Sequence, residues 1–188
     1  MKIGICGKIA SGKTTFANLL VENYGFQKFS FATAVKQFAT EICGMNPDKK
    51  DRELLQKIGH EGRRLLFEDV WVETVIRKTK QVDLAIVDDV RYINEFNALK
   101  NNGWIMIKLN ISSELQEKRI RETYPDNFQQ HLDNLTHPSE TEMDEINIKA
   151  FDYSINVDEP DCFDKFFYTF TSLYLKKVKK LKGYTNLI

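Results

Sequence analysis

The sequence predicts an α/β fold in which a parallel sheet of five strands carries helices on both faces. Apolar segments of strand length alternate with helical patterns along all 188 residues, and this alternation is typical of a parallel sheet with crossover helices. A glycine-containing loop follows the first segment, and Asp88 and Asp89 follow the third. Because parallel sheets bind ligands beyond the carboxyl ends of their strands, we expect the chemistry at that edge.

The N-terminal region predicts a strand, a loop, a helix and a second strand. Residues 2–6 are a short apolar run, and the loop of residues 7–12 follows it. Apolar residues at helical spacing then predict a helix that starts near Lys13 and ends at Gly25. Residues 27–31 are the second predicted strand.

A helical region follows the second strand. Residues 33–42 have a helical pattern that ends before Gly44 and Pro47. Residues 51–80 predict mostly helix, with a break near residues 68–69. This region separates the second strand from the third, as a crossover connection requires.

The most buried strand is predicted at residues 82–87, an apolar run with one acidic residue. Residues 93–100 predict a helix that ends in Asn-Asn-Gly, and residues 104–109 predict the next strand. Ser113 and Gln116 have the spacing of a capping box, which predicts the start of another helix.

The C-terminal third contains the least regular segment. Residues 122–145 lack periodicity and contain two prolines, so they predict a loop or flap with at most a short helix. Residues 153–157 predict the last strand, and Cys162–Leu181 predicts an amphipathic helix. We expect one domain over residues 1–188, with a core of residues 1–121 and 146–188 around a flap at about 122–145.

Composition argues against several classes of function. Lys+Arg and Asp+Glu each number 27, so the formal net charge is zero and a general nucleic-acid coat protein is disfavoured. No apolar run approaches the roughly 18 residues that cross a bilayer. The three cysteines Cys6, Cys43 and Cys162 form no disulfide framework, so we expect reduced thiols and a cytoplasmic location.

A basic run near the C-terminus is interpreted as a solvated helix face, with nucleic-acid binding as the alternative. It consists of Lys176, Lys177, Lys179, Lys180 and Lys182. We expect no stable nucleic-acid partner and no membrane partner. A zinc site is disfavoured because the three histidines and three cysteines are scattered along the chain.

The loop after the first strand matches G-x-x-x-x-G-K-[ST] at every fixed position. The predicted phosphate-binding residues are Gly7, Lys8, Ile9, Ala10, Ser11, Gly12, Lys13, Thr14 and Thr15. The glycines let backbone N–H groups turn toward phosphate oxygens, and the following helix adds its positive end. Lys13 reaches the β- and γ-phosphates, and the Thr14 hydroxyl can ligate Mg²⁺. The sequence therefore predicts nucleoside triphosphate binding and a three-layer P-loop NTPase fold.

The chain lacks the N-K-x-D and D-x-x-G strings expected of a GTPase. Its short length and its flap favour a small-molecule kinase, in which a flap closes over ATP and excludes water. Two alternatives stay open. One is a P-loop kinase for another small phosphate acceptor, such as a phosphomevalonate-like compound or a coenzyme precursor, and the other is a nucleotide-binding protein without catalysis.

Four further stretches carry a family pattern: Phe-Ala-Thr-Ala-Val-Lys at 31–36, Leu-Leu-Gln-Lys-Ile-Gly-His-Glu-Gly-Arg-Arg at 54–64 with Asp-Val-Trp-Val at 69–72, Asp-Asp-Val-Arg-Tyr-Ile-Asn-Glu at 88–95, and His-Pro-Ser-Glu at 137–140. With the phosphate loop they resemble the deoxynucleoside monophosphate kinases of tailed bacteriophages, a branch of the P-loop kinases. The resemblance spans residues 4 to about 157.

This resemblance implies a five-stranded fold of nucleoside monophosphate kinase type with a lid. It implies ATP as phosphoryl donor, Mg²⁺ as cofactor and a (deoxy)nucleoside monophosphate as acceptor. A phage-encoded chain would act in the host cytoplasm. Members of the family can be homodimers, but no pattern in this chain shows an interface. The accepted base and the choice between deoxyribose and ribose stay open.

The candidate residues fall into four groups. The catalytic group is Lys13, Asp89, Arg91, Arg119 and Arg121. The acceptor-binding group is Phe31, Lys36, Arg63, Arg64, Asp69, Trp71, Asp89, Arg91 and Glu95. The lid group is His137, Ser139 and Glu140, which anchor the flap or contact nucleotide. The metal group is Thr14 and Asp88, which would hold Mg²⁺ directly or through water.

Some of these assignments rest on the resemblance, and others leave a choice. The resemblance places Lys36 at the acceptor phosphate and puts Asp89 with Arg91 in a family motif. Asp88 is closer to the usual strand-end carboxylate position. Arg91 contacts a phosphate or pairs with Glu95.

Four more assignments have two readings. Arg64 is the first choice to grip the monophosphate, and Arg63 is the alternative. At most one of Arg119 and Arg121 should reach the γ-phosphate, because residues two apart on a helix do not share a face. Trp71 stacks on the acceptor base or fills the core, and Asp69 binds the acceptor's sugar or base or caps a helix.

Overall fold

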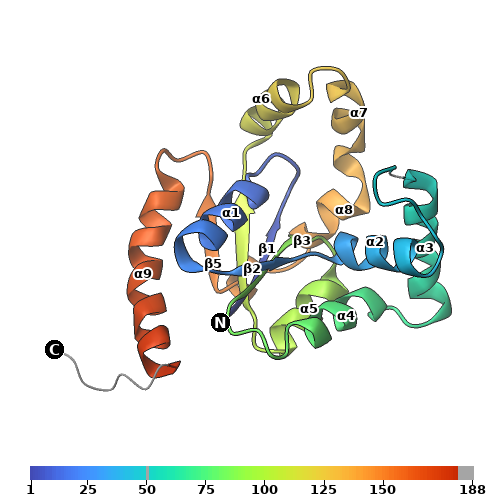
Figure 1. Ribbon diagram of the computed structural model, residues 1–188. Coiled ribbons are helices and arrows are strands. Elements are labelled where there is room, and N and C mark those ends of the chain that lie inside the picture. Colours follow the sequence, from blue (N-terminus) through green and yellow to red (C-terminus); the bar gives the residue numbers. More distant parts are fainter. Residues whose placement is uncertain (50, 182–188) are drawn as a thin grey trace.

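Five parallel strands form one sheet in the order β2-β3-β1-β4-β5 (Figure 1). The computed structural model describes residues 1–49 and 51–181, with side chains for all of these except residues 52, 56, 60 and 173–181. The strands are β1 (Lys2–Gly7), β2 (Gln27–Phe29), β3 (Ala85–Val90), β4 (Ile105–Asn110) and β5 (Tyr153–Asn156). The predicted fold class is confirmed. The lysines of the basic run at 176–182 lie outside the described side chains.

One face of the sheet is covered by α1 (Lys13–Tyr24) and α9 (Cys162–Leu181) (Figure 1). Phe16 of α1 packs edge-on against Phe166 and is stacked on Phe167, with ring centroids 5.1 and 5.2 Å apart. Together with Ile5 of β1 these rings form a closed apolar core. The apolar face of the amphipathic helix predicted at 162–181 therefore packs toward the sheet through Phe166 and Phe167, because burial of such rings is strongly favourable.

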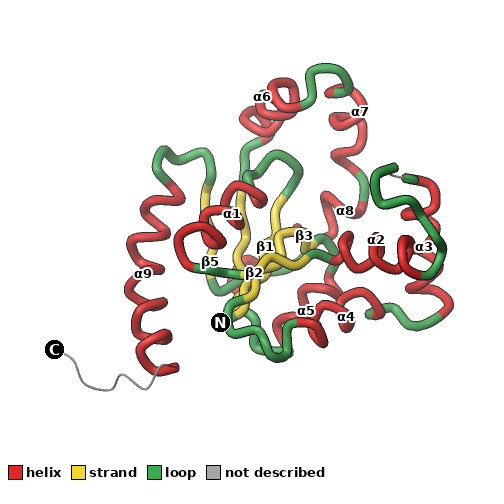
Figure 2. The backbone as a smooth tube through the Cα atoms, in the orientation of Figure 1, coloured by secondary structure: helices red, strands yellow, loops and turns green. Residues whose placement is uncertain are grey.

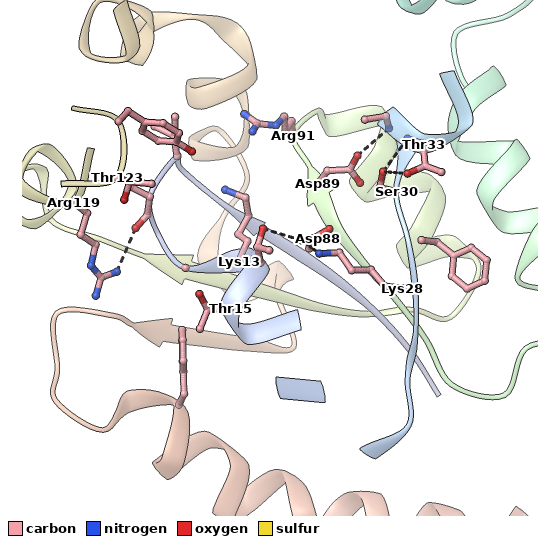
Figure 3. Close-up of a pocket in the computed structure, with 18 residues that line it drawn as sticks. Lys13, Thr15, Lys28, Ser30, Thr33, Asp88, Asp89, Arg91, Arg119 and Thr123 are labelled. Atoms are coloured by element: carbon pink, nitrogen blue, oxygen red, sulfur yellow. Dashed lines mark hydrogen bonds and ion pairs between the residues drawn. The ribbon is translucent and has the colours of Figure 1, made fainter. Parts of the chain in front are cut away.

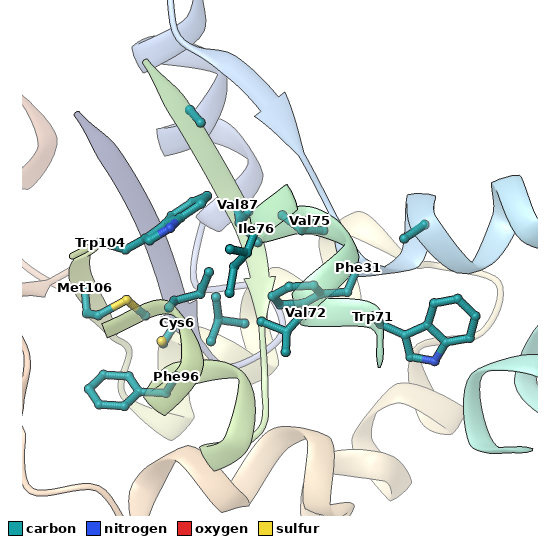
Figure 4. Packing of buried hydrophobic residues seen from close by; sticks show 14 of the residues in the cluster. Cys6, Phe31, Trp71, Val72, Val75, Ile76, Val87, Phe96, Trp104 and Met106 are labelled. Atoms are coloured by element: carbon teal, nitrogen blue, oxygen red, sulfur yellow. The ribbon is translucent and has the colours of Figure 1, made fainter. Parts of the chain in front are cut away.

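The other face is covered by α2 (Phe31–Glu41), α4 (Val70–Lys78) and α5 (Ile93–Asn101). Their buried side chains form a second core with Cys6, Val87 and Met106 of the sheet (Figure 4). α3 (Arg52–Leu65) lies against α2 and α4. The helical region predicted at 51–80 thus divides as expected, with its break between α3 and α4.

The second and third strands differ from their predicted bounds. β2 ends at Phe29, because the Ser30 side chain accepts a hydrogen bond from the Thr33 amide and starts α2 two residues early. β3 starts at Ala85 and runs through Asp88 and Asp89 to Val90. The ladder with β1 pairs Val87 with Gly4 and Val90 with Cys6, so the two aspartates lie within the strand and not after it.

The capping residue of α6 (Ser113–Thr123) also differs from the prediction. Ser112, and not Ser113, accepts the hydrogen bond from the Leu115 amide. Gln116 does not close a capping box with Ser113. Its side-chain amide donates to the Ile9 carbonyl at 3.1 Å, so tertiary contact with the phosphate loop replaces the local cap.

The flap of residues 122–145 contains more helix than predicted. Its short helices are α7 (Phe128–Asp133), η1 (Asn134–Thr136), α8 (Pro138–Thr141) and η2 (Glu142–Asp144), and η3 (Ile148–Ala150) follows it. The flap rises from the same end of the sheet as the loop between β1 and α1 (Figure 2). Within the described ranges, no helix has both the length and the apolar content to cross a membrane.

Candidate active site

The phosphate loop connects β1 directly to α1. Ala10 and Gly12 have positive φ angles of 63° and 88°, which turn the loop back on itself. At Gly7 an added Cβ would lie 2.6 Å from the Ser11 hydroxyl and 2.9 Å from the Leu109 carbonyl oxygen, so only glycine fits. Gly12 brings no side chain to cap α1. The first amides of that helix are therefore suited to an anion.

Lys13 begins α1 and is almost completely buried. Its ammonium donates to the carbonyl oxygens of Gly7 at 2.5 Å and Lys8 at 2.7 Å. Desolvation, followed by repulsion from Arg91, lowers the pKa of Lys13 to about 8. The cation is thus held inside its own loop, where phosphate oxygens can replace the two carbonyls.

Asp88 and Asp89 point to opposite faces of the sheet, because successive side chains of a strand alternate. Asp88 lies on the α1 face, where its Oδ2 accepts from the Thr14 hydroxyl at 3.2 Å. Asp89 lies on the α2 face and accepts from the amides of Phe31 and Ala32 at 3.1 and 3.0 Å. Asp88 therefore contacts the helix that follows the phosphate loop, and Asp89 binds the first amides of α2.

A lysine that the sequence did not single out shares this corner. The ammonium of Lys28 on β2 lies 2.6 Å from Asp88 Oδ2. No motif includes Lys28. The only signal would have been its position in a strand that neighbours β3, and strand order is not visible in one sequence.

The phosphate loop opens onto a cavity of about 890 Å³ (Figure 3). Lys13 lies between Arg119 on one side and Asp88 with Lys28 on the other. The lining residues are Ile9, Ala10, Gly12, Lys13, Thr14, Thr15, Lys28, Phe29, Ser30, Ala32, Thr33, Asp88, Asp89, Arg91, Arg119, Thr123, Tyr124 and Phe163. We call this the loop cavity.

A second cavity of about 630 Å³ adjoins the first between α2, α3 and the start of α5. Its lining residues are Phe31, Ala32, Val35, Gly59, Arg63, Trp71, Asp89, Arg91, Tyr92, Glu95 and His137. We call this the side cavity. Ala32, Asp89 and Arg91 line both cavities, so groups bound in the two would meet beside these residues.

Arg91 links the sheet to the flap. Its guanidinium pairs with the Glu140 carboxylate and donates to the Ser139 carbonyl at 3.3 Å. The same carboxylate accepts from the Ile9 amide of the phosphate loop at 2.6 Å. His137 precedes α8, and its ring nitrogen Nδ1 accepts from the Ser139 amide. The three lid candidates thus gather at one point where the flap touches the loop and Arg91.

Two further acidic side chains hold the flap against the core. Asp144 lies 3.0 Å from the Lys8 ammonium and 3.2 Å from that of Lys108. Glu142 accepts from the Ile93 amide at 2.8 Å. The flap contains no lysine or arginine and is therefore held through its carboxylates, which cations and helix N-termini attract.

The structure separates Arg63 from Arg64. Arg63 lines the side cavity, pairs with Glu95 at 2.9 Å and lies 4.6 Å above the Tyr92 ring. Arg64 is 62% exposed and pairs with Glu61 on the same helix. Of the two arginines, Arg63 lines the side cavity and Arg64 lines neither cavity, so Arg63 is the better placed for the predicted acceptor phosphate.

Glu95 is buried beneath the side cavity. Its carboxylate accepts from the amides of Arg91 and Tyr92 at 2.9 and 3.1 Å and pairs with Arg63. Desolvation nevertheless outweighs these contacts and raises the pKa of Glu95 to about 7. Arg91 and Glu95 are therefore joined through the backbone, and the Arg91 side chain stays directed to the flap.

We expect Glu95 to make stability fall as the pH rises from about 4.5 to about 7. A carboxyl whose pKa is raised on folding favours the folded state in its protonated form, so its contribution is complete below pH 4.5 and lost through pH 7. The contribution of Glu95 to the free energy of unfolding should fall by about 3 kcal/mol over this pH range. Urea denaturation of wild type and Glu95→Gln across this range isolates the effect. A constant difference between the two proteins would contradict it.

The structure also separates Arg119 from Arg121. Arg119 lines the loop cavity and donates to the Ala10 carbonyl at 3.3 Å. Arg121 lies 4.5 Å from the Phe128 ring and pairs with Glu117 one turn earlier. Of the two arginines, Arg119 contacts the phosphate loop, and Arg121 lines neither cavity.

We expect Arg119→Met to lower ATP-dependent turnover about a hundredfold or more and Arg121→Met to change it less than about threefold. A positioned arginine stabilises the charge of a migrating phosphoryl group, whereas an exposed ion pair contributes little. Steady-state rates at saturating ATP provide the measurement. Equal losses in the two variants would contradict the assignment.

The remaining acceptor candidates divide in the same way. Phe31 and Trp71 line the side cavity. Trp71 also packs in the core and donates to the Gly59 carbonyl at 3.0 Å, and its stacking on an acceptor base stays a prediction. Asp69 accepts from the Asn94 side chain and lines neither cavity. Lys36 is exposed on α2 and also lines neither.

Comparison with known proteins gives one similar sequence and a shared fold. No family model matches the chain. A protein of Acanthamoeba polyphaga mimivirus named "Putative deoxynucleotide monophosphate kinase" is 24% identical, with 80% of this chain and 84% of that protein covered.

Three solved structures resemble the whole chain. An uncharacterized protein from Eubacterium ventriosum has a TM-score of 0.57 at 15% identity, over 92% of this chain and 99% of that one. TT1252 from Thermus thermophilus has 0.55 at 14%, over 100% and 98%. Shikimate kinase from Aquifex aeolicus has 0.53 at 15%, over 93% and 99%. At these identities the likeness shows the fold.

The fold is that of the P-loop kinases, and this chain adds a complete phosphate loop with the Asp88 carboxylate beside Thr14. Such a loop is suited to binding a nucleoside triphosphate, which is the donor in phosphoryl transfer.

Proposed function

We propose that this protein transfers a phosphoryl group from Mg·ATP to a (deoxy)nucleoside monophosphate and releases two diphosphates. The observation that carries this proposal is the pair of adjoining cavities, which share Asp89 and Arg91 beside the phosphate loop. A donor in the loop cavity and an acceptor in the side cavity would bring their phosphates together at that border. Positioning of this kind supplies much of the catalysis of phosphoryl transfer.

The donor half of the site uses groups already in place. The amides of the loop and the first turn of α1 bind the donor phosphates, and Lys13 neutralises their charge. Arg119 enters from α6 at the opposite end from Asp88 and stabilises charge on the migrating group. In this proposal Tyr124 and Phe163, which line the loop cavity, border the donor nucleoside.

The residues present fit a magnesium ion. The Thr14 hydroxyl and the Asp88 carboxylate share one corner of the loop cavity, and both are hard oxygen ligands of the kind that Mg²⁺ prefers. No group of three or more metal-binding side chains occurs among the described residues, which agrees with an ion held mainly by phosphates and water. The bound ion would supply neutralising charge to the donor phosphates.

The acceptor half combines one apolar wall with two cations. Phe31, Val35 and Trp71 offer surface for a base, and Arg63 and Arg91 offer guanidinium groups for a phosphate. Asp89 holds the start of α2 and thereby fixes the wall to the sheet. His137 closes the cavity from the flap.

The name of the viral relative supports a deoxynucleotide as the acceptor. The motif blocks at 31–36, 54–64 with 69–72, 88–95 and 137–140 support the same class, and all four contribute residues to the side cavity. The last block supplies His137. We retain the tailed-phage branch as a proposal on these motifs.

A coupled ADP-release assay with Mg·ATP against the four deoxynucleoside and four ribonucleoside monophosphates tests the proposal. Turnover with one or more of the eight is the expected result, and the pattern gives the base and sugar preference. ATP binding without turnover of any of the eight would overturn the proposed acceptor. That outcome would favour a kinase for another small phosphate acceptor or a binding protein.

A further inference from the structure

Asp88 Oδ2 has two donors in this structure. The Thr14 hydroxyl lies 3.2 Å away and the Lys28 ammonium lies 2.6 Å away. Both donors line the loop cavity, and the Asp88 side chain is only 8% exposed. The same hydroxyl and carboxylate are the pair that we assign to Mg²⁺, so the ammonium uses an oxygen that the metal would use.

The pairing of β2 with β3 positions Lys28 beside Asp88. Lys28 pairs with Ile86 in the β2–β3 ladder, and Asp88 lies two residues further along β3. Side chains two apart in a strand share a face. Lys28 and Asp88 therefore both project on the α1 side, where the side chain of Thr14 also lies. The ion pair is consequently set by the backbone and does not depend on the chance orientation of two surface side chains.

A buried carboxylate without a partner is costly, and an ammonium removes that cost. The same neutralisation weakens the attraction of the site for a free divalent cation, because the charge of the single carboxylate is already balanced by the ammonium. Donor phosphates would bring the additional negative charge that Mg²⁺ needs. The contact thus favours entry of the metal together with the nucleotide.

We propose that Lys28 occupies the cation position beside Asp88 and Thr14 in the nucleotide-free protein, and that Mg²⁺ must displace it. This inference rests on the metal assignment of the proposed function. Lys28 is a positioning residue in this scheme, because it acts through Asp88. Its removal should expose a metal site that the wild type keeps closed.

The test is the binding of Mn²⁺ alone, measured by the loss of the electron paramagnetic resonance signal of the free ion. Lys28→Met keeps the length of the side chain and removes its charge. We expect this variant to bind Mn²⁺ about tenfold or more tightly than wild type, since a repelling unit charge has left the site. Lys149→Met, which removes an exposed lysine on η3, should bind like wild type.

Two further variants make the result decisive. Adding Asp88→Asn to Lys28→Met should abolish the gain, because the carboxylate that binds the ion has gone. Lys28→Gln keeps a hydrogen bond to Asp88 without a charge, and it should also gain affinity if Lys28→Met fails to fold. Unchanged or weaker Mn²⁺ binding in the folded neutral variants would overturn the proposal.

The outcome is separable from that of the proposed function. Mn²⁺ binding is measured without ATP and without an acceptor, so absence of turnover with nucleoside monophosphates leaves it intact. Conversely, normal turnover with unchanged Mn²⁺ affinity in both neutral Lys28 variants would remove the role of Lys28 and leave the kinase assignment standing.

Discussion

Replacement of Lys13 by methionine should lower ATP-dependent phosphoryl transfer about a thousandfold or more. Methionine keeps the buried stem and removes the ammonium that donates to the Gly7 and Lys8 carbonyls. In the proposed mechanism this ammonium moves to the donor phosphates, where the cavity walls make a charge worth more than in water. A thousandfold loss corresponds to about 4 kcal/mol of transition-state stabilisation. ADP release with the best acceptor provides the measurement.

The pH dependence of ATP affinity provides a second test of the role of Lys13. Because burial lowers the pKa of Lys13 to about 8, the free protein loses this positive charge as the pH rises through about 8. Wild-type ATP affinity should therefore fall over that range, and the affinity of Lys13→Met should stay flat. Lys149→Met serves as the control for an exposed lysine and should match wild type. Near-normal turnover of Lys13→Met would contradict the role given to the loop.

Replacement of Arg91 should have the next largest effect. Its guanidinium lies on the border between the two cavities, so the proposed function has it contact phosphate groups from either side. Arg91→Lys keeps the charge and loses the forked geometry, and we expect it to lower kcat/KM for the acceptor about a hundredfold. Steady-state kinetics at saturating ATP provide the measurement, with an independent ATP binding assay alongside.

A direct change of Arg91 to a neutral residue would leave the buried Glu140 carboxylate without its cation and destabilise the fold. The double variant Arg91→Met/Glu140→Gln removes both charges together and avoids this problem. We expect it to lose about a thousandfold in kcat/KM while ATP affinity changes far less. Arg77→Lys, an exposed arginine on α4, is the matched control. Retention of most activity by Arg91→Lys and the double variant would contradict the assignment.

The flap contacts the donor and acceptor parts of the proposed site through one side chain. Glu140 accepts from the Ile9 amide and pairs with Arg91, so a single carboxylate joins the phosphate loop to the border of the side cavity. Asp144 and Glu142 hold the same segment against Lys8 and the start of α5. In the proposed function, movement of the flap would therefore change contacts at the donor site and at the acceptor site together.

Local sequence was sufficient for the fold class and for the phosphate loop. Apolar runs alternating with helical patterns predicted five parallel strands, and the fixed residues of the loop lie adjacent in the chain. The conformation of such a loop depends on nearby glycines such as Gly7 and Gly12, whose positive φ angles are local properties. The break in the helical region at 68–69 and the end of α1 at Gly25 were predicted for the same reason.

Local sequence was insufficient wherever the assignment of a residue depended on the direction in which its side chain faces in the folded protein. The roles of Asp88 and Asp89 could not be firmly separated from the sequence, because the predicted strand ended before both of them. The ladder with β1 extends β3 through both, and strand alternation then sends them to different faces. Ser112 replaced Ser113 as the cap of α6, and its hydroxyl also donates to Asp158. The short helices of the flap contact Ile9 and Ile93, which are distant in the chain.

The sequence by itself therefore determined that this protein has a parallel α/β fold and a loop built for triphosphates. Only the tertiary structure decided that Arg63 and Arg119 face the cavities while Arg64 and Arg121 do not, and that Lys28 reaches Asp88. The physical reason is the range of the interactions. A turn or a periodic stripe is encoded by neighbours in the chain, whereas a cavity is made by side chains whose strands and helices meet only on folding.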